Sequence, residues 1–195
     1  MSTERPILMN GEMVKALLAG SKSQTRRLMK PQPFKLCGIT YWKDFSWCPG
    51  ANQPDIASHC PLGIAGSHLW VRETWQDGEF AQNEPKGPVY RATDPNWETC
   101  EGWKWKPSIF MPRSASRITL EILEVRVQRL QDITDGDAFA EGVGTAMDRV
   151  PAALNYPGKW INLYQELWDS LNSKRGFGWT ANPYVWALTF RRIKP

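Results

Sequence analysis

Long apolar runs are missing from this sequence of 195 residues, and no signal-peptide pattern stands at its start. A transmembrane helix needs about 20 consecutive apolar residues, and a secretory signal needs a positively charged segment followed by an apolar one. Internal repeats and low-complexity tracts are missing as well. These absences exclude a membrane-spanning chain and a repeat array, and we expect a soluble cytoplasmic protein that does not associate with membranes.

Cysteine and histidine are scarce, with four and two residues respectively. The cysteines are widely spaced and form no C-x-x-C pair, so we predict reduced thiols and neither a metal nor a cofactor. The alternative is a zinc site within one loop, made by Cys37, Cys48, His59 and Cys60. Adjacent His59 and Cys60 fit the usual ligand spacing poorly. His59 and His68 also do not provide a catalytic histidine pair.

Hydrophobic residues make up 42% of the chain, which is enough for one domain with a substantial core. We therefore predict a single domain over residues 1–195. The formal net charge of +4 and the pI near 8.9 permit a polyanionic partner without requiring one. The eleven tryptophans are unusual. Most are expected to pack in the core and the loops, and the others offer surfaces on which bases can stack.

The stretch richest in reactive groups covers residues 20–27, with the sequence GSKSQTRR. An apolar strand is predicted before it, over residues 6–9. A helix over residues 12–19 follows that strand, with Asn10 as its N-cap and Gly20 as its end. The reactive stretch is therefore expected just past the end of a helix, where the chain is free to turn.

Lys22 and Thr25 are three residues apart, which places them on one face if the helical turn continues. A threonine hydroxyl needs a neighbouring base to act as a nucleophile, and a lysine amine can serve when burial or a nearby cation lowers its pKa. Arg26 and Arg27 supply such cations, or bind phosphate. The alternative is that these basic residues only stabilise the negative C-terminal end of the helix.

A strand is predicted over residues 69–75, where alternation places Glu73 on the same face as Leu69 and Val71. If this face is the interior, the Glu73 carboxylate points inward and requires a partner, because an isolated buried charge is too costly. Lys22 is the predicted partner. The alternative, in which Glu73 lies solvated on the rim, fits the pattern equally well.

Three long regions without sustained periodicity are predicted to be loop insertions: residues 34–68, 76–112 and 143–158. Loops of this length in a compact domain are usually functional or disordered, and the aromatic residues of the first favour a packed flap beside the site. The second contains a short predicted strand over residues 89–92, and tryptophans that alternate with lysines over residues 103–106. That alternation suits single-stranded nucleic acid, or a loop held on the surface of the domain, which we favour.

The C-terminal half carries the clearest secondary-structure signals. A long strand is predicted over residues 118–130, with a β-bulge near residues 122–123 where the alternation changes phase. A short helix follows, capped by Thr134 and ended by Gly142. The remaining predicted elements are an amphipathic helix and a last strand, over residues 160–171 and 184–191.

Four segments together resemble a known family. They are the motif G-x-K-x-x-T-x-R over residues 20–27 and the later segments LWVRETW, KPSIFMPR and NPYVW. Together they are similar to the ASCH domain, in the long form common in bacteriophages and prophages, and the resemblance extends from Pro6 to Phe190. It implies an α+β fold: a small PUA-like β-barrel with flanking helices and long loop insertions. For a phage-encoded protein it also implies the cytoplasm of the bacterial host.

Within that family, the bacterial acetylcytidine amidohydrolases use a lysine, a threonine and a glutamate. The resemblance assigns these roles to Lys22, Thr25 and Glu73. Lys22 would take the proton of Thr25, whose oxygen attacks the amide carbonyl of an acylated cytidine. Glu73 would then direct water at the acyl-threonine, or return a proton to the leaving amine. The resemblance therefore implies a hydrolase that acts on a modified cytidine without a cofactor.

Other members of the family are RNA binders or ribonucleases, so the alternative is an RNA-binding module or ribonuclease without amidase activity. The residues predicted to bind substrate or nucleic acid are Gly20, Arg26, Arg27, Arg72, Trp75, Arg113 and Arg117. Binding of single-stranded RNA through these cations would weaken steeply with salt. A phage accessory protein that engages another protein is a third hypothesis, which no residue pattern specifically supports.

Overall fold

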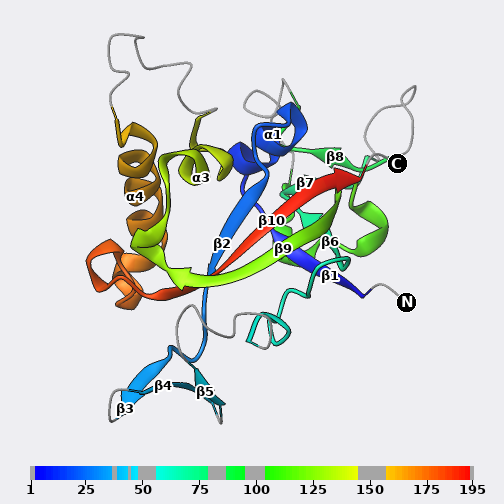
Figure 1. The fold of residues 1–195 in the computed structure, drawn as a ribbon. Helices are drawn as coiled ribbons and strands as arrows, with labels where there is room; N and C mark the ends of the chain where they lie inside the picture. The colour runs from blue at the N-terminus through cyan, green and yellow to red at the C-terminus, as the bar shows by residue number, and fades with distance from the viewer. Residues whose placement is uncertain are drawn as a thin grey trace.

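A five-stranded β-sheet is the centre of the computed structural model (Figure 1). The structure describes residues 3–36, 39–43, 45–47, 56–78, 87–94, 104–144 and 157–193. The strand order is β1-β6-β9-β10-β2, with bounds Glu4–Leu8, His68–Arg72, Thr119–Arg129, Tyr184–Ile193 and Gln24–Leu28. β1 and β6 are parallel, and the other neighbouring strands are antiparallel. With helices beside this sheet, the domain is a mixed α+β domain, as predicted.

A side chain, rather than a backbone ladder, links the two outer strands of the sheet. Arg27 of β2 donates a hydrogen bond from Nη2 to the carbonyl oxygen of Leu8, the last residue of β1, at 2.7 Å. Within the described ranges no backbone pairing joins β1 to β2. The small α+β domain is therefore confirmed, but the strand pairing does not by itself close a barrel.

Helix α1, Gly11–Ala19, connects β1 to β2 and confirms the predicted helix. The Asn10 side chain accepts a hydrogen bond from the Met13 amide at 2.8 Å, which satisfies one of the unpaired donors of the first turn. Gly20 ends the helix in the left-handed conformation, with φ of 79°. The chain thus leaves α1 in a fixed direction toward β2.

Two further helices lie side by side next to β2 and β10 (Figure 1): α3, Asp135–Ala140, and α4, Lys159–Asn172. The predicted cap of α3 is confirmed, because the Thr134 hydroxyl accepts a hydrogen bond from the Asp137 amide at 3.1 Å. Short 3-10 helices are η1 Ser108–Phe110, η2 Arg113–Ala115, η3 Leu130–Asp132, η6 Ser173–Arg175 and η7 Trp179–Ala181. No helix in these described ranges is long and apolar enough to cross a bilayer.

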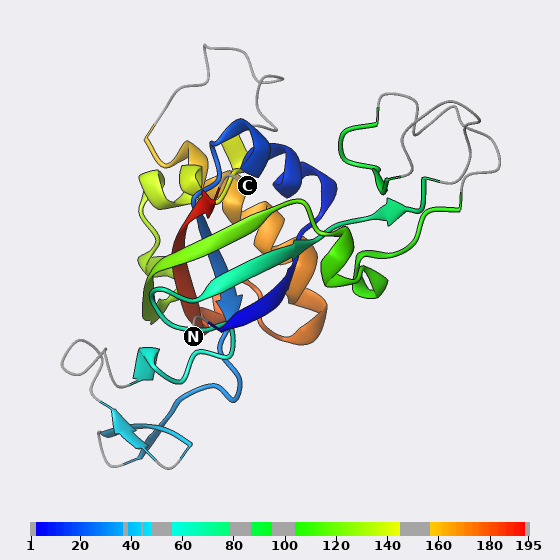
Figure 2. The same cartoon turned by 90° about the vertical axis from the view of Figure 1, so that its right-hand side faces the viewer.

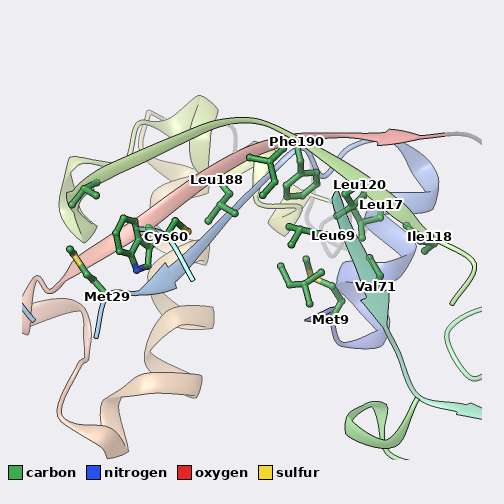
Figure 3. Packing of buried hydrophobic residues seen from close by; sticks show 14 of the residues in the cluster. Met9, Leu17, Met29, Cys60, Leu69, Val71, Ile118, Leu120, Leu188 and Phe190 are labelled. Atoms are coloured by element: carbon green, nitrogen blue, oxygen red, sulfur yellow. The ribbon is translucent and has the colours of Figure 1, made fainter. Parts of the chain in front are cut away.

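Hydrophobic residues pack on both faces of β10. Leu188 and Phe190 point into the larger cluster, which α1 covers with Leu17 (Figure 3). Val185 points to the other face and belongs to a second cluster with Trp168 of α4. Because both of its faces are covered, β10 is buried along most of its length, and it provides the rigid support to which β2 is paired.

The β-bulge predicted near residues 122–123 is confirmed in β9. Thr189 of β10 pairs with Glu124, but the next residue, Phe190, pairs with Ile122, so Leu123 is the extra residue. The side chain of Leu123 is 46% exposed, whereas Ile122 is fully buried. The change of phase in the apolar pattern of residues 118–130 therefore correctly predicted the change of register between β9 and β10.

The region over residues 34–68, predicted as an irregular flap, contains a small three-stranded sheet instead. Its strands are β3 Phe34–Leu36, β4 Ile39–Trp42 and β5 Phe45–Trp47. Figures 1 and 2 show this sheet projecting from one end of the domain. Trp42 attaches it to the core, because its ring packs edge-to-face on Trp186 at 5.6 Å and its Nε1 donates to the carbonyl oxygen of Pro31 at 2.9 Å.

Two other predictions differ in extent. The strand predicted over residues 89–92 is confirmed only as β8, Val89–Tyr90, which pairs with β7, Trp75–Gln76. Strand β2 was not predicted, since the sequence QTRRL shows no apolar alternation. Much of the second and third predicted insertions, residues 79–86, 95–103 and 145–156, lies outside the described residues.

Replacing Gly20 by alanine is expected to lower the free energy of unfolding by about 1 kcal/mol, because a left-handed φ of 79° strains any residue with a Cβ atom. The added methyl group meets no atom within 4 Å, so the effect isolates the backbone strain. Gly87→Ala is the matched control, since Gly87 also has open space but no positive φ. Equal denaturation midpoints for the two variants would contradict this account.

Candidate functional site

The turn between α1 and β2 fixes the position of Lys22. The amides of Ser21 and Lys22 both donate to the carbonyl oxygen of Ala16, at 3.0 and 3.2 Å, and the Ser23 amide donates to Ala140 at 2.9 Å. Thr25 follows as the second residue of β2, where it pairs with Leu188. Lys22 and Thr25 are therefore held on a turn and a strand, and not on the continued helix that one interpretation of their spacing assumed.

The Lys22 amine is buried and uses all three of its hydrogens. The residue is 3% exposed, and Nζ donates to the Gln24 carbonyl at 2.8 Å, to the Glu141 carbonyl at 2.6 Å and to Glu141 Oε2 at 3.1 Å. Burial lowers the pKa of Lys22, while the Glu141 carboxylate acts against that shift. The partner of Lys22 is thus Glu141, which sequence reasoning missed.

Glu141 reaches this position because of the glycine beside it. It follows α3 directly, and Gly142 next to it has a φ of 87°. A Cβ atom on Gly142 would lie 2.9 Å from the Cβ of Ala16 and 3.1 Å from the Cβ of Lys22, so only glycine allows α3 to approach this closely. The sequence offered Gly142 as a helix end, but nothing in it indicated that Glu141 would meet Lys22.

Arg26 is the second buried cation of the site, with a fully buried side chain. Its Nη1 donates to Glu141 Oε1 at 3.0 Å, and its Nη2 lies 3.1 Å from Asp137 Oδ2 in an ion pair. Within the described part of the chain, Nε and Nη2 nevertheless make no hydrogen bond of good geometry. Arg26 therefore retains donor capacity in a buried position, where an unpaired donor is costly.

Glu73 points inward, as one of the two interpretations predicted, and is 1% exposed. Its partner is Arg117, whose Nε and Nη2 each lie 2.9 Å from one carboxylate oxygen. Arg117 also stacks 3.9 Å from the centre of the Tyr90 ring. The predicted pairing of Glu73 with Lys22 is wrong, because both carboxylate oxygens are occupied by Arg117 and Lys22 is paired with Glu141.

The other residues predicted to bind substrate fall into two groups. Gly20, Arg26 and Arg27 lie at β2 or in the turn before it. A second group, Arg72, Trp75, Arg113 and Arg117, lies around the 3-10 helices of residues 108–115 and is engaged within the chain. Arg72 donates to the Ile109 carbonyl, Trp75 packs with Met111, and Arg113 pairs with Glu4. The structure therefore divides the predicted site into two places.

A pocket of about 370 Å³ lies beside β2, and we call it the β2 pocket. Its described lining residues come from α1, β2, α4 and η6 and from the segments just after β2 and α3: Met13, Thr25, Arg26, Arg27, Leu28, Lys30, Glu141, Tyr164, Leu167, Trp168, Leu171, Asn172 and Arg175. Thr25, Arg26 and Glu141 are buried, whereas Lys30 and Arg175 are exposed. Glu141 is the one carboxylate among these lining residues, and burial raises the pKa of Tyr164, which keeps its hydroxyl protonated.

The alternative zinc site lies partly outside the described residues, because Cys37 and Cys48 are not among them. His59 packs against Trp42, and Cys60 is buried, which raises the pKa of its thiol. The described ranges contain no cluster of three or more histidine, cysteine or acidic residues placed to hold a metal ion.

Compared with known proteins, the chain matches no family model and no curated protein. Among solved structures it is similar to the crystal structure of protein EF3133 from Enterococcus faecalis V583, whose family model is DUF984. The identity is 9% and the TM-score is 0.46, and the match covers 99% of this chain and 82% of that chain.

Glu141→Gln is expected to lower the free energy of unfolding by about 3 kcal/mol, because it leaves two buried cations without their shared carboxylate. Chemical denaturation measures the loss. Glu121→Gln is the control, since Glu121 pairs with an Arg191 side chain that is 67% exposed, and such pairs contribute little. If both variants lose the same free energy of unfolding, the buried ion pairs contribute no more to stability than an exposed one.

Asp137 is expected to contribute to stability above pH 4 and to lose this contribution in acid. Burial acts to raise the pKa of Asp137, but the hydrogen bond from Gln24 and the Arg26 guanidinium outweigh it and hold the pKa below its ordinary value. The unfolded chain, with an ordinary pKa of about 3.9, therefore takes up the proton first as the pH falls. Asp137→Asn should lose less stability than the wild type between about pH 4 and pH 2.

The measurement for Asp137 is a series of thermal denaturation curves over this pH range. Glu166→Gln, at an exposed position of α4, is the control and should follow the wild type. Parallel pH profiles for Asp137→Asn and the wild type would show that the Asp137 pKa is not lowered in the folded state.

Proposed function

We propose that this chain is a nucleoside-directed or nucleic-acid-directed protein of the ASCH type, and that it removes an acyl group from a modified cytidine in the β2 pocket. The ASCH assignment rests on the G-x-K-x-x-T-x-R motif, whose residues form the turn and strand beside this pocket. We further propose that the five-stranded sheet is an open form of the PUA-like barrel, with Arg27 bridging its two edges.

The observation that carries the proposal is that Thr25 and Arg26 line the same pocket. Nε of Arg26 makes no hydrogen bond within the described residues, whereas Nη2 is ion-paired with Asp137. Buried donors of this kind can stabilise the negative charge that develops on a carbonyl oxygen during acyl transfer. A hydroxyl and an oxyanion-binding group in one pocket are two of the parts that such a reaction needs.

The proposed reaction begins with attack of the Thr25 oxygen on the amide carbonyl carbon, while its proton passes to a base. Lys22 is the proposed base: it first passes one proton to Glu141, whose Oε2 lies 3.1 Å from Nζ, and the burial that lowers the pKa of Lys22 favours this transfer, which leaves a neutral amine to accept the proton of Thr25. The C–N bond then breaks, the cytosine amine leaves with that proton, and water releases the acyl group from threonine. Glu141 takes the carboxylate role predicted for Glu73, since it is the acid that contacts Lys22.

Hydrolysis of N4-acetylcytidine to cytidine, followed by chromatography, tests this proposal. Thr25→Val removes the hydroxyl with almost no change in shape and is expected to lower turnover by a factor on the order of 1,000 or more. Thr25→Ser keeps a hydroxyl and should retain a measurable part of the activity. Circular dichroism of each variant checks that the fold is intact.

The outcomes separate the proposed enzyme from the alternative. Wild-type turnover that Thr25→Val leaves unchanged would overturn the role of Thr25. If the wild type binds cytidine or short RNA but releases no acetate, the protein is an RNA-binding module without amidase activity. If it neither hydrolyses N4-acetylcytidine nor binds cytidine or RNA at low salt, the nucleic-acid assignment is wrong.

A further inference from the structure

Charges in the interior of the site are balanced. Lys22 and Arg26 contribute two positive charges, and they face the carboxylates of Glu141 and Asp137 at distances of 3.0 to 3.1 Å. Both oxygens of Glu141 are used by these two cations. Glu141 therefore has no carboxylate oxygen free for a direct ion pair with another cation of the β2 pocket.

The other cations that line the pocket lack a direct ion pair with a carboxylate of the described residues. Arg27, Lys30 and Arg175 form no ion pair within 4.0 Å in the described part of the chain. Arg27 is partly buried and donates from Nη2 to the Leu8 carbonyl, while Lys30 and Arg175 are exposed. Three positive charges that make no direct ion pair in the described residues, from β2, from the segment just after it and from η6, thus line one pocket, which favours an anionic group there.

One wall of the same pocket is apolar. Leu167, Trp168 and Leu171 project from α4 into its lining, and Asn172 adds a side-chain amide beside them. A wall of this kind offers a flat ligand an apolar surface and one polar contact. Cations on one part of the lining and apolar groups on another suit a ligand that is charged at one end and aromatic at the other.

We propose that Arg27, Lys30 and Arg175 bind a phosphate group, so that the ligand of the β2 pocket is a nucleoside phosphate rather than a free nucleoside. The inference rests on the proposed function for the nucleoside and adds the phosphate. Guanidinium groups bind phosphate through paired, charge-assisted hydrogen bonds. The volume of about 370 Å³ lies at the small end of ligand pockets, so one nucleotide unit is bound, either a mononucleotide or the terminal nucleotide of an RNA.

Binding of cytidine, cytidine 5′-monophosphate (CMP) and inorganic phosphate to the full chain, measured by calorimetry at low and moderate salt, tests the inference. CMP is expected to bind roughly 10-fold or more tightly than cytidine, because hydrogen bonds to a charged group are stronger than neutral ones. This advantage should shrink as the salt concentration rises. A trinucleotide of cytidine with a 5′-phosphate distinguishes the end of an RNA from a free mononucleotide.

Matched substitutions locate the phosphate. Arg175→Gln is expected to weaken CMP binding more than cytidine binding, and so to remove most of the advantage of CMP over cytidine. Lys174→Gln is the control, since Lys174 is the neighbouring exposed cation of η6 and is not among the residues that line the pocket. Both positions are exposed, so neither variant is expected to disturb the fold.

Each outcome decides the inference. The inference is supported if Arg175→Gln loses more affinity for CMP than Lys174→Gln does. Which of CMP and the phosphorylated trinucleotide binds more tightly to the wild type then identifies the ligand. Equal affinities for cytidine and CMP overturn the phosphate site and leave the proposed function intact. If Arg175→Gln and Lys174→Gln lose the same amount of CMP affinity, the pocket attracts anions in general and the inference is overturned. The same holds if inorganic phosphate binds as tightly as CMP. If none of the probes binds, the inference and the nucleic-acid assignment fall together.

Discussion

The ion pairs of Glu141 with Lys22 and Arg26 are the interaction on which the site depends. Two positive charges next to each other in the interior are tolerated only when carboxylates face them, and here Glu141 serves both while Asp137 adds a second contact to Arg26. This arrangement ties the end of α3 to the start of β2. The turn after α1, the strand β2 and the pocket beside it are all positioned by that contact.

The β2 pocket lies at the edge of the sheet because β2 is an edge strand. β2 pairs with β10 on one side only, and its other side faces β1 without a backbone ladder in the described ranges. Arg27 links the two strands with one hydrogen bond to Leu8. An edge of this kind leaves space for a pocket between the strand and a helix. Glu73, which is paired with Arg117 on the β6 side of the sheet, stabilises a different part of the domain.

Local sequence patterns predicted most helices and strands well, but they did not predict which side chains distant in the sequence contact each other. Rules that act within a few residues predicted three features that the structure confirms: the cap of α1 at Asn10, its end at Gly20 and the β-bulge of β9 at Leu123. Strand β2 was missed because its burial comes from neighbouring elements and leaves no apolar alternation. The partner of Lys22 was missed because Glu141 is 119 residues away in the chain. Charge balance requires a partner, but it does not say which of several carboxylates will be near.

The small sheet over β3, β4 and β5 is joined to the domain more firmly than its position outside the five-stranded sheet suggests. Trp42 is 1% exposed and fills part of the main hydrophobic cluster beside Trp186. A shortened chain cut at the boundaries of this sheet would thus lose a wall of the core and leave a void the size of an indole ring. The extension is consequently a component of the folding unit and not a removable module.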